Sequence, residues 1–145
     1  MTDSMTGKIV DLRLSVAKRA PMRVVERVEV TAGEGLAGDR HARAGSDRQI
    51  LLMDRAVLEE LGLEGGQLHE NITVEGLSLF GLDRGRKLRL GDGVDVQVGE
   101  LCDPCDYMDN IQPGLRKRLE GQRGLFVTPL TGGTLRLGDE VSVIE

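Results

Sequence analysis

The chain has 145 residues, 39% of them hydrophobic, and a formal net charge of −5, which fits one globular domain with a core of its own. The negative charge argues against a nucleic-acid or anionic-membrane partner. The aromatic residues are one tyrosine and two phenylalanines, too few for the stacking platforms that bind single-stranded nucleic acid.

No apolar run approaches the ~20 residues that a membrane span needs, and the N-terminus lacks the apolar core of a secretory signal. We therefore expect a cytoplasmic protein without a membrane partner. Residues 1–6 are expected to form a disordered tail and residues 7–145 a single domain. In a reducing compartment, two cysteines more often indicate chemistry or metal binding than a structural disulfide.

Strand candidates recur along the whole chain as short apolar or alternating segments between turn residues. Between residues 33 and 38, three glycines form a loop where the backbone bends sharply or approaches another group closely. The strand candidates are residues 8–15, 23–30, 50–52, 71–74, 87–90, 94–98, 125–130, 134–137 and 141–144.

Only two short helices are expected. The first covers residues 54–61, with Asp54 as its N-terminal cap and Gly62 as its stop. Pro113 favours the start of a second, basic helix over residues 114–120.

The strands and helices together favour a mainly β fold. Residues 88–94 recur in residues 135–141 as strand, Gly-Asp turn and strand, and two ordinary hairpins are the simpler explanation. Two short helices cannot cover both faces of an open parallel sheet. Closure removes exposed strand edges, so the pattern predicts a closed mixed β-barrel of about seven strands.

Cys102 and Cys105 are the only cysteines, and they sit in a turn around Pro104. A dithiol redox motif is disfavoured, because no βαβ pattern surrounds them and the acidic residues nearby would raise a thiol pKa. A zinc site would need His41 and His69 as its other ligands. Two interpretations remain beside zinc: a pair of inert buried cysteines, or one thiolate that binds a soft transition metal or carries sulfur.

The glycine loop could bind an anion. Gly35 and Gly38 free backbone amides, and Arg40, Arg43 and Arg48 lie with them in a stretch of fourteen residues. The loop is not a P-loop, because no Gly-Lys-Ser/Thr follows it. In the alternative interpretation it is an ordinary solvated loop in which Asp39 pairs with Arg40 or Arg48.

The polar triplet from His69 to Asn71 lies between a glycine turn and a strand candidate. It could be an ordinary turn that Asn71 closes. It could equally supply hydrogen bonds to a ligand, and both interpretations stay open.

Taken in this order, the clusters resemble the MOSC domain, the C-terminal domain of molybdenum cofactor sulfurases, which also occurs as a stand-alone protein. The resemblance covers residues 7–145. The residues that carry it are Gly35–His41, Arg48–Ile50, Glu70–Leu77, Leu90–Asp92 and Cys102–Cys105.

The resemblance implies a closed, strand-rich barrel that binds a pterin-dithiolene molybdenum cofactor. It implies that Cys105, which ends the Asp-Pro-Cys motif, is the catalytic cysteine that binds molybdenum or carries sulfur as a persulfide, with Cys102 as an addition. It also implies cofactor contacts from a larger set, namely Gly38, Asp39, Arg40, Arg48, Gln49, Glu70 and Asn71.

Related domains suggest two functions. One is an oxidoreductase that reduces N-hydroxylated compounds with electrons from a separate protein, with His41, His69 and Glu70 as possible proton donors. The other is a non-catalytic carrier of sulfur or cofactor, supplied by a separate sulfur-donor protein because this chain has no room for the pyridoxal-phosphate domain of full sulfurases. A Cys2His2 zinc-binding structural domain is a further alternative.

Overall fold

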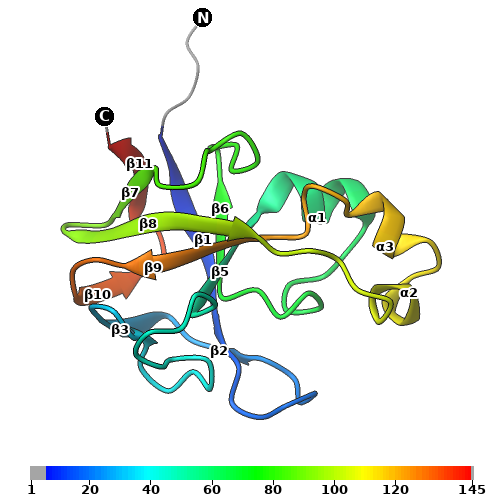
Figure 1. Cartoon of the computed structure of the whole chain (residues 1–145), viewed down its shortest axis with the longest axis horizontal. Helices are drawn as coiled ribbons and strands as arrows, with labels where there is room; N and C mark the ends of the chain where they lie inside the picture. Colours follow the sequence, from blue (N-terminus) through cyan, green and yellow to red (C-terminus); the bar gives the residue numbers. More distant parts are fainter. Residues whose placement is uncertain (1–5, 145) are drawn as a thin grey trace, which may run out of the picture.

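The computed structural model describes residues 6–144, which form a closed barrel with a helical extension on one side (Figure 1). The barrel order is β11-β7-β8-β9-β5-β6-β1, and β1 pairs back with β11 to close the ring. Among the described strands of the barrel, only the β5–β6 pair is parallel, so the predicted closed, mixed, seven-stranded barrel is confirmed. Its strands are β1 (Thr6–Leu14), β5 (Ile50–Asp54), β6 (Ile72–Glu75), β7 (Lys87–Leu90), β8 (Val94–Leu101), β9 (Leu125–Pro129) and β11 (Glu140–Ile144).

Four further strands lie beside the barrel. β2 (Arg23–Val24) extends the barrel sheet at β1. β3 (Arg27–Thr31) pairs with β4 (Gly35–Leu36) and β10 (Gly133–Arg136) in a separate small sheet. The single strand expected over residues 23–30 is therefore two strands, because the chain leaves the barrel sheet at β2 and enters the small sheet at β3.

The two similar strand-turn-strand segments do not behave alike. β7 and β8 form the expected hairpin. The second expected hairpin is wrong, since β10 pairs with β3 while β11 pairs with β7 and β1. Leu135 of β10 and Val28 of β3 lie opposite each other and are both buried in the core. This burial, and not the sequence of the local turn, decides which strand pairs with β10.

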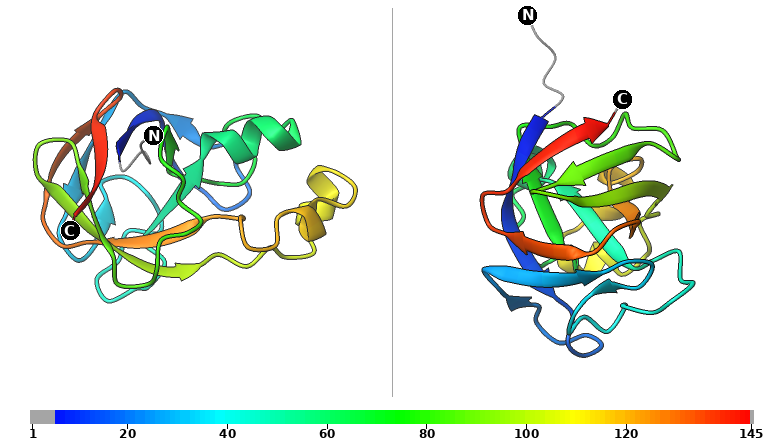
Figure 2. Two further views of the ribbon diagram at one scale, coloured as in Figure 1. Left: turned by 90° about the horizontal axis from the view of Figure 1, so that it is seen from above. Right: turned by 90° about the vertical axis from the view of Figure 1, so that its left-hand side faces the viewer.

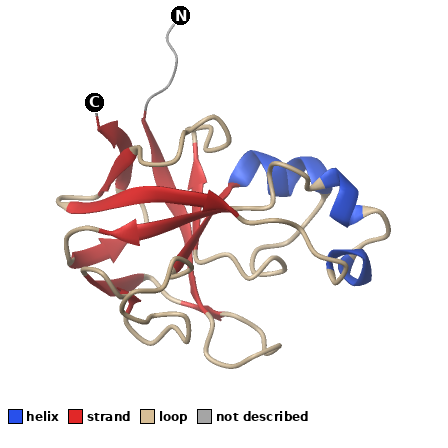
Figure 3. Ribbon diagram, viewed as in Figure 1, coloured by secondary structure: helices blue, strands red, loops and turns tan. Residues whose placement is uncertain are grey.

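Three short helices form the extension (Figure 3). α1 (Arg55–Leu61) matches the prediction: Asp54 Oδ1 accepts a hydrogen bond from Ala56 N at 3.0 Å, and Gly62 has φ +68°. α3 (Leu115–Arg118) lies within the predicted second helix. α2 (Met108–Ile111) was not predicted, because four residues are too few to show a helical period.

The core has two parts. Leu12, Ile50 and Val96 belong to the apolar cluster inside the barrel, and Met53, Leu61 and Leu115 to a second cluster under the helices. Figure 2 shows the helices gathered on one side, away from the small sheet. Residues 1–5 of the expected tail lie outside the described residues, and β1 begins at Thr6. None of the helices in residues 6–144 is long and apolar enough to cross a membrane.

Candidate functional site

A pocket of about 170 Å³ opens where the segment after the glycine loop, the start of β5, the end of β8 and the start of β9 meet. We call it the central pocket. It brings together three regions that the sequence analysis considered separately. They are the segment from His41 to Arg48 after the glycine loop (the arginine loop), the polar triplet from His69 to Asn71, and the segment around Cys102 (the cysteine segment). Its lining residues are His41, Arg48, Leu51, His69, Asn71, Cys102, Arg123 and Phe126.

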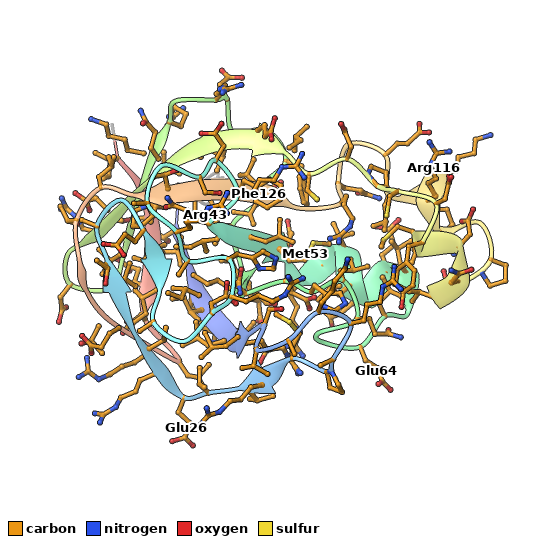
Figure 4. All side chains as sticks on the ribbon, turned by 60° about the horizontal axis from the view of Figure 1, so that its bottom comes forward. Glu26, Arg43, Met53, Glu64, Arg116 and Phe126 are labelled. Atoms are coloured by element: carbon orange, nitrogen blue, oxygen red, sulfur yellow. The ribbon has the colours of Figure 1, made fainter. Side chains whose placement is uncertain are left out.

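A second pocket of about 320 Å³ adjoins it, because both are lined by His41 and Arg48. Its other lining residues are Arg40, Arg43 and Ser46, and we call it the arginine pocket. Figure 4 shows Arg43 and Phe126 on neighbouring parts of the molecule, and Arg116 apart from them at the helical extension. The arginines that follow the glycine loop therefore gather next to the central pocket, as an anion site requires.

Arg40 and Arg48 each contact a polar or charged side chain of another segment. Arg40 Nε donates a hydrogen bond to Ser15 Oγ at 2.9 Å. Arg48 Nε lies 3.4 Å from Glu100 Oε1, and its guanidinium lies 5.4 Å from the centre of the Phe126 ring. The expectation that Asp39 pairs with Arg40 or Arg48 is thus wrong, since these arginines pair with Ser15 and Glu100.

Asp39 is buried and organises the loop. Its carboxylate accepts hydrogen bonds from Ser15 N at 2.6 Å and His41 N at 3.1 Å. His41 Nδ1 lies 3.4 Å from Asp39 Oδ2, so the same carboxylate orients the imidazole at the rim of both pockets.

Asn71 crosslinks three segments below the central pocket. Its Oδ1 accepts a hydrogen bond from Leu51 N at 2.9 Å. Its Nδ2 donates to Arg13 O at 3.0 Å and to Asp39 Oδ1 at 3.1 Å. Asn71 lines the pocket, but its polar atoms are engaged within the chain.

Glu70 is fully buried under the turn before β6. Its carboxylate accepts hydrogen bonds from Gly66 N at 2.8 Å and Leu68 N at 3.2 Å. Burial raises the pKa of Glu70, and these two hydrogen bonds oppose that rise. Glu70 therefore holds the backbone that carries His69.

Gln49 and Gly38 shape the glycine loop from inside. Gln49 is buried, and its Nε2 donates to Gly33 O at 2.7 Å and Arg43 O at 2.9 Å. Gly38 has φ +87°, a conformation that favours glycine, and a Cβ there would lie 3.4 Å from Leu14 Cδ1. Both residues build the loop that displays the arginines.

The two cysteines lie in different environments. Cys102 is half-buried, lines the central pocket and donates its backbone N–H to Gly124 O at 2.8 Å. Burial raises the pKa of the Cys102 thiol, and the charges of Arg123 and Arg48 oppose this. Cys105 is exposed and stands outside the set of residues that line the central pocket.

Arg123 is a site residue that the sequence analysis missed. It is 8% exposed, and its Nη1 is buried without a hydrogen-bond partner among the described residues. A single arginine in the turn before β9 belongs to no repeating pattern, so nothing in the sequence marked it. Leu51 and Phe126 were missed for a similar reason, since their strand positions indicate core packing.

The two histidines meet at the central pocket. Burial lowers the pKa of His69, and the nearby charges of Arg123, Arg40 and His41 lower it further. The imidazole of His69 is therefore neutral near pH 7.

The zinc alternative finds no support in the structure. Within residues 6–144, no three His, Cys, Asp or Glu side chains are placed to hold one metal ion. His41, His69 and Cys102 line the central pocket while Cys105 lies at the surface, so the Cys2His2 set is not assembled.

Comparisons with known proteins identify relatives of this fold. A family model described as "MOSC domain" matches residues 39–142. The crystal structure of the YuaD protein from Bacillus subtilis is 21% identical, with a TM-score of 0.79 and 96% of each chain covered. YiiM from Geobacillus stearothermophilus is 21% identical, with a TM-score of 0.73, and 96% of this chain matches 75% of that one. YiiM from Escherichia coli is 18% identical, with a TM-score of 0.69, over 95% of this chain and 70% of that one. No curated protein matches the sequence.

Proposed function

The chain belongs to the MOSC domain family, which is associated with the molybdenum cofactor, and we propose that it binds this cofactor across the central and arginine pockets. The observation that carries the proposal is the buried guanidinium of Arg123, whose Nη1 has no partner among the described residues, in the pocket wall that also contains Arg48.

The residues present fit such a ligand. A buried guanidinium nitrogen without an acceptor is costly, and an anionic ligand would supply one. The cofactor is an anionic phosphate ester with sulfur ligands around a soft metal. Guanidinium groups suit its phosphate, and a cysteine thiolate suits its metal.

Within this proposal the residues around the pockets divide into two groups. Arg40 and Arg48, with Arg43, would hold the phosphate from the arginine pocket, while Arg123 would bind an anionic part of the ligand in the central pocket. The other predicted residues support the walls through the hydrogen bonds and turns described above: Gly38, Asp39, Gln49, Glu70 and Asn71. Asn71 also lines the central pocket.

We assign the reactive thiol to Cys105. A thiol that exchanges sulfur or metal with a separate protein must be exposed, and Cys105 is. Burial raises the pKa of Cys102, which keeps that thiol protonated at neutral pH as part of the pocket wall. For Cys105 to bind metal in the central pocket, the segment 103–106 has to turn inward.

The reaction we propose is reduction of N-hydroxylated compounds. The N–O bond breaks, a separate electron-donor protein supplies two electrons, two protons are taken up, and the products are water and an amine, or an amidine where the substrate is an amidoxime. When bound, the cofactor supplies the two-electron redox chemistry. The chain supplies the anion site, the thiol and an imidazole, His41, that Asp39 orients at the rim of the pocket.

The exposure of Cys105 also supports a second candidate function. A persulfide on an exposed thiol is within reach of a separate donor and acceptor protein, so the domain could carry sulfur without turnover.

One experiment separates the two functions. The protein is loaded with cofactor, its molybdenum and pterin contents are measured, and reduction of benzamidoxime by a strong artificial electron donor is followed. Reductase activity that requires molybdenum supports the first function. If the protein contains molybdenum but does not reduce the N-hydroxylated compound, the reductase function is contradicted and the carrier function remains.

A further inference from the structure

We propose that a third pocket, which adjoins the central pocket at His69, is the substrate site and that it selects flat N-hydroxylated compounds carrying a negative charge, with the ring against Tyr107 and the charged group at Arg19. This inference rests on the proposed reductase function. We call the third pocket the tyrosine pocket.

The position of the tyrosine pocket suits a substrate. Its volume is about 430 Å³, within the size range of small-molecule sites. His69 lines both this pocket and the central pocket. A ligand bound against Tyr107 would therefore lie beside the same imidazole as a cofactor in the central pocket.

The backbone around the tyrosine pocket is strained at two points. Among the described residues, Arg19 and His69 are the only non-glycine residues with positive φ, at 60° and 58°, and both line this pocket. Such conformations are costly for residues with a side chain, and they gather at ligand sites. The buried Glu70 holds the turn before His69 in place through Gly66 N and Leu68 N.

The charge of the tyrosine pocket is opposite to that of the whole chain. Asp and Glu outnumber Lys and Arg by 24 to 19 in the sequence, yet none of the described acidic residues lines this pocket. Asp106 and Asp109 lie near Tyr107 in the sequence but do not line the pocket: Asp106 Oδ1 lies 3.3 Å from Arg116 Nε, and Asp109 Oδ1 accepts a hydrogen bond from the backbone N–H of Arg116 at 3.0 Å. Arg19 therefore favours a substrate with a negative charge and disfavours a cation.

The remaining lining residues suit a flat ring. Tyr107 is 48% exposed, so much of its ring is open to a stacking partner. Ile111 and Pro21 add apolar contact area, and Gln67 and Asn110 bring amide groups that can bind polar atoms at the edge of a ring.

The test uses the fact that Tyr107 is the only tyrosine and the chain has no tryptophan. NMR spectra of protein labelled at tyrosine ring carbons report on Tyr107 alone. The ligands are 4-carboxybenzamidoxime and the matched cation 4-(aminomethyl)benzamidoxime. We expect the carboxylate to shift the Tyr107 ring signals and to bind roughly tenfold more tightly than the cation in calorimetry, the size of one charge-assisted contact.

Matched variants test whether Arg19 causes the preference for the carboxylate over the cation. Arg19→Gln should remove most of the tenfold preference, whereas Arg84→Gln, at an exposed loop between β6 and β7, should keep it. Tyr107→Leu should weaken both ligands alike. Equal binding of the two ligands, a preference that survives Arg19→Gln, or ring signals that ignore the bound carboxylate would each overturn the inference.

Molybdenum and pterin are measured on the same samples. Protein that retains the cofactor while Tyr107 does not respond contradicts this inference but not the proposed function. Protein that never retains the cofactor, yet binds the carboxylate at Tyr107 and Arg19, contradicts the proposed function and leaves the tyrosine pocket as an anion-selective site for flat ligands.

Discussion

Asn71 Nδ2 donates a hydrogen bond to Asp39 Oδ1 at 3.1 Å, although the two residues are 32 positions apart. This bond joins the glycine loop to the segment that enters β6, and Asp39 in turn orients His41. The arrangement of the central pocket therefore depends on a hydrogen-bond network inside the chain, even before any ligand binds.

The network predicts a large stability cost for Asn71→Ala. The change leaves Leu51 N, Arg13 O and Asp39 Oδ1 without their amide partner. An unsatisfied buried group costs about 1–3 kcal/mol, so we expect the free energy of unfolding in urea to fall by about 3 kcal/mol or more. Asn110→Ala, at an exposed position, is the control and should change it by less than about 0.5 kcal/mol. Equal small losses in both variants would contradict the network.

The second prediction concerns pH. The folded-state pKa of Glu70 is raised above its usual value of 4.5 by burial, so the unfolded chain releases this proton at lower pH than the folded one. The protonated form therefore stabilises the fold below the unfolded-state pKa, and this contribution is lost as pH rises through the folded-state pKa. Glu70→Gln should remove this loss, which sets in as pH rises above 4.5, measured as urea unfolding at each pH. An unchanged slope in the variant would show that Glu70 does not cause it.

The third prediction concerns the environment of His69. Its pKa lies below the usual 6.5 because of burial first and of Arg123 second. NMR titration, with two histidines to assign, should show His69 titrating below that value, and Arg123→Gln should raise its pKa. Arg84→Gln should leave it unchanged. If the pKa of His69 did not change in Arg123→Gln, the charge of Arg123 would not be a cause of the lowered pKa.

The fourth prediction concerns the anion site. Arg40→Ala should weaken cofactor binding roughly tenfold or more, because a charge-assisted hydrogen bond is worth about 1.5–3 kcal/mol. The measurement is the dissociation constant of the cofactor from the loaded protein. Arg84→Ala is the matched control away from the arginine pocket. If both variants bound the cofactor as the unaltered protein does, the phosphate would lie elsewhere.

Much of the fold could be predicted because its signals are local. Asp54 and Gly62 mark both ends of α1, and alternating residues between glycine turns mark the barrel strands. The pairing of β10 was not predictable from its turn, because contacts between β3 and β10 that are distant in sequence decide it. Four residues in α2 gave no period to detect.

The candidate site was predicted by region more than by role. The arginine loop, the polar triplet and the cysteine segment do meet at one end of the barrel. Residue types alone cannot tell whether a polar group such as that of Asp39 or Asn71 serves a ligand or the chain itself, since only the hydrogen-bond partners decide this. Arg123 gave no signal, because its burial arises from tertiary packing.

We propose that the thiol of Cys105 binds the molybdenum of a cofactor held by this chain. The most direct measurement is the molybdenum and pterin content per chain after loading, for the unaltered protein, Cys105→Ala and Cys102→Ala. We predict that the unaltered protein and Cys102→Ala retain both components and that Cys105→Ala loses most of the molybdenum. Retention of molybdenum by Cys105→Ala together with its loss from Cys102→Ala would assign the metal-binding role to Cys102 in the pocket wall. An unaltered protein that retains neither molybdenum nor pterin would contradict the proposed binding of the cofactor.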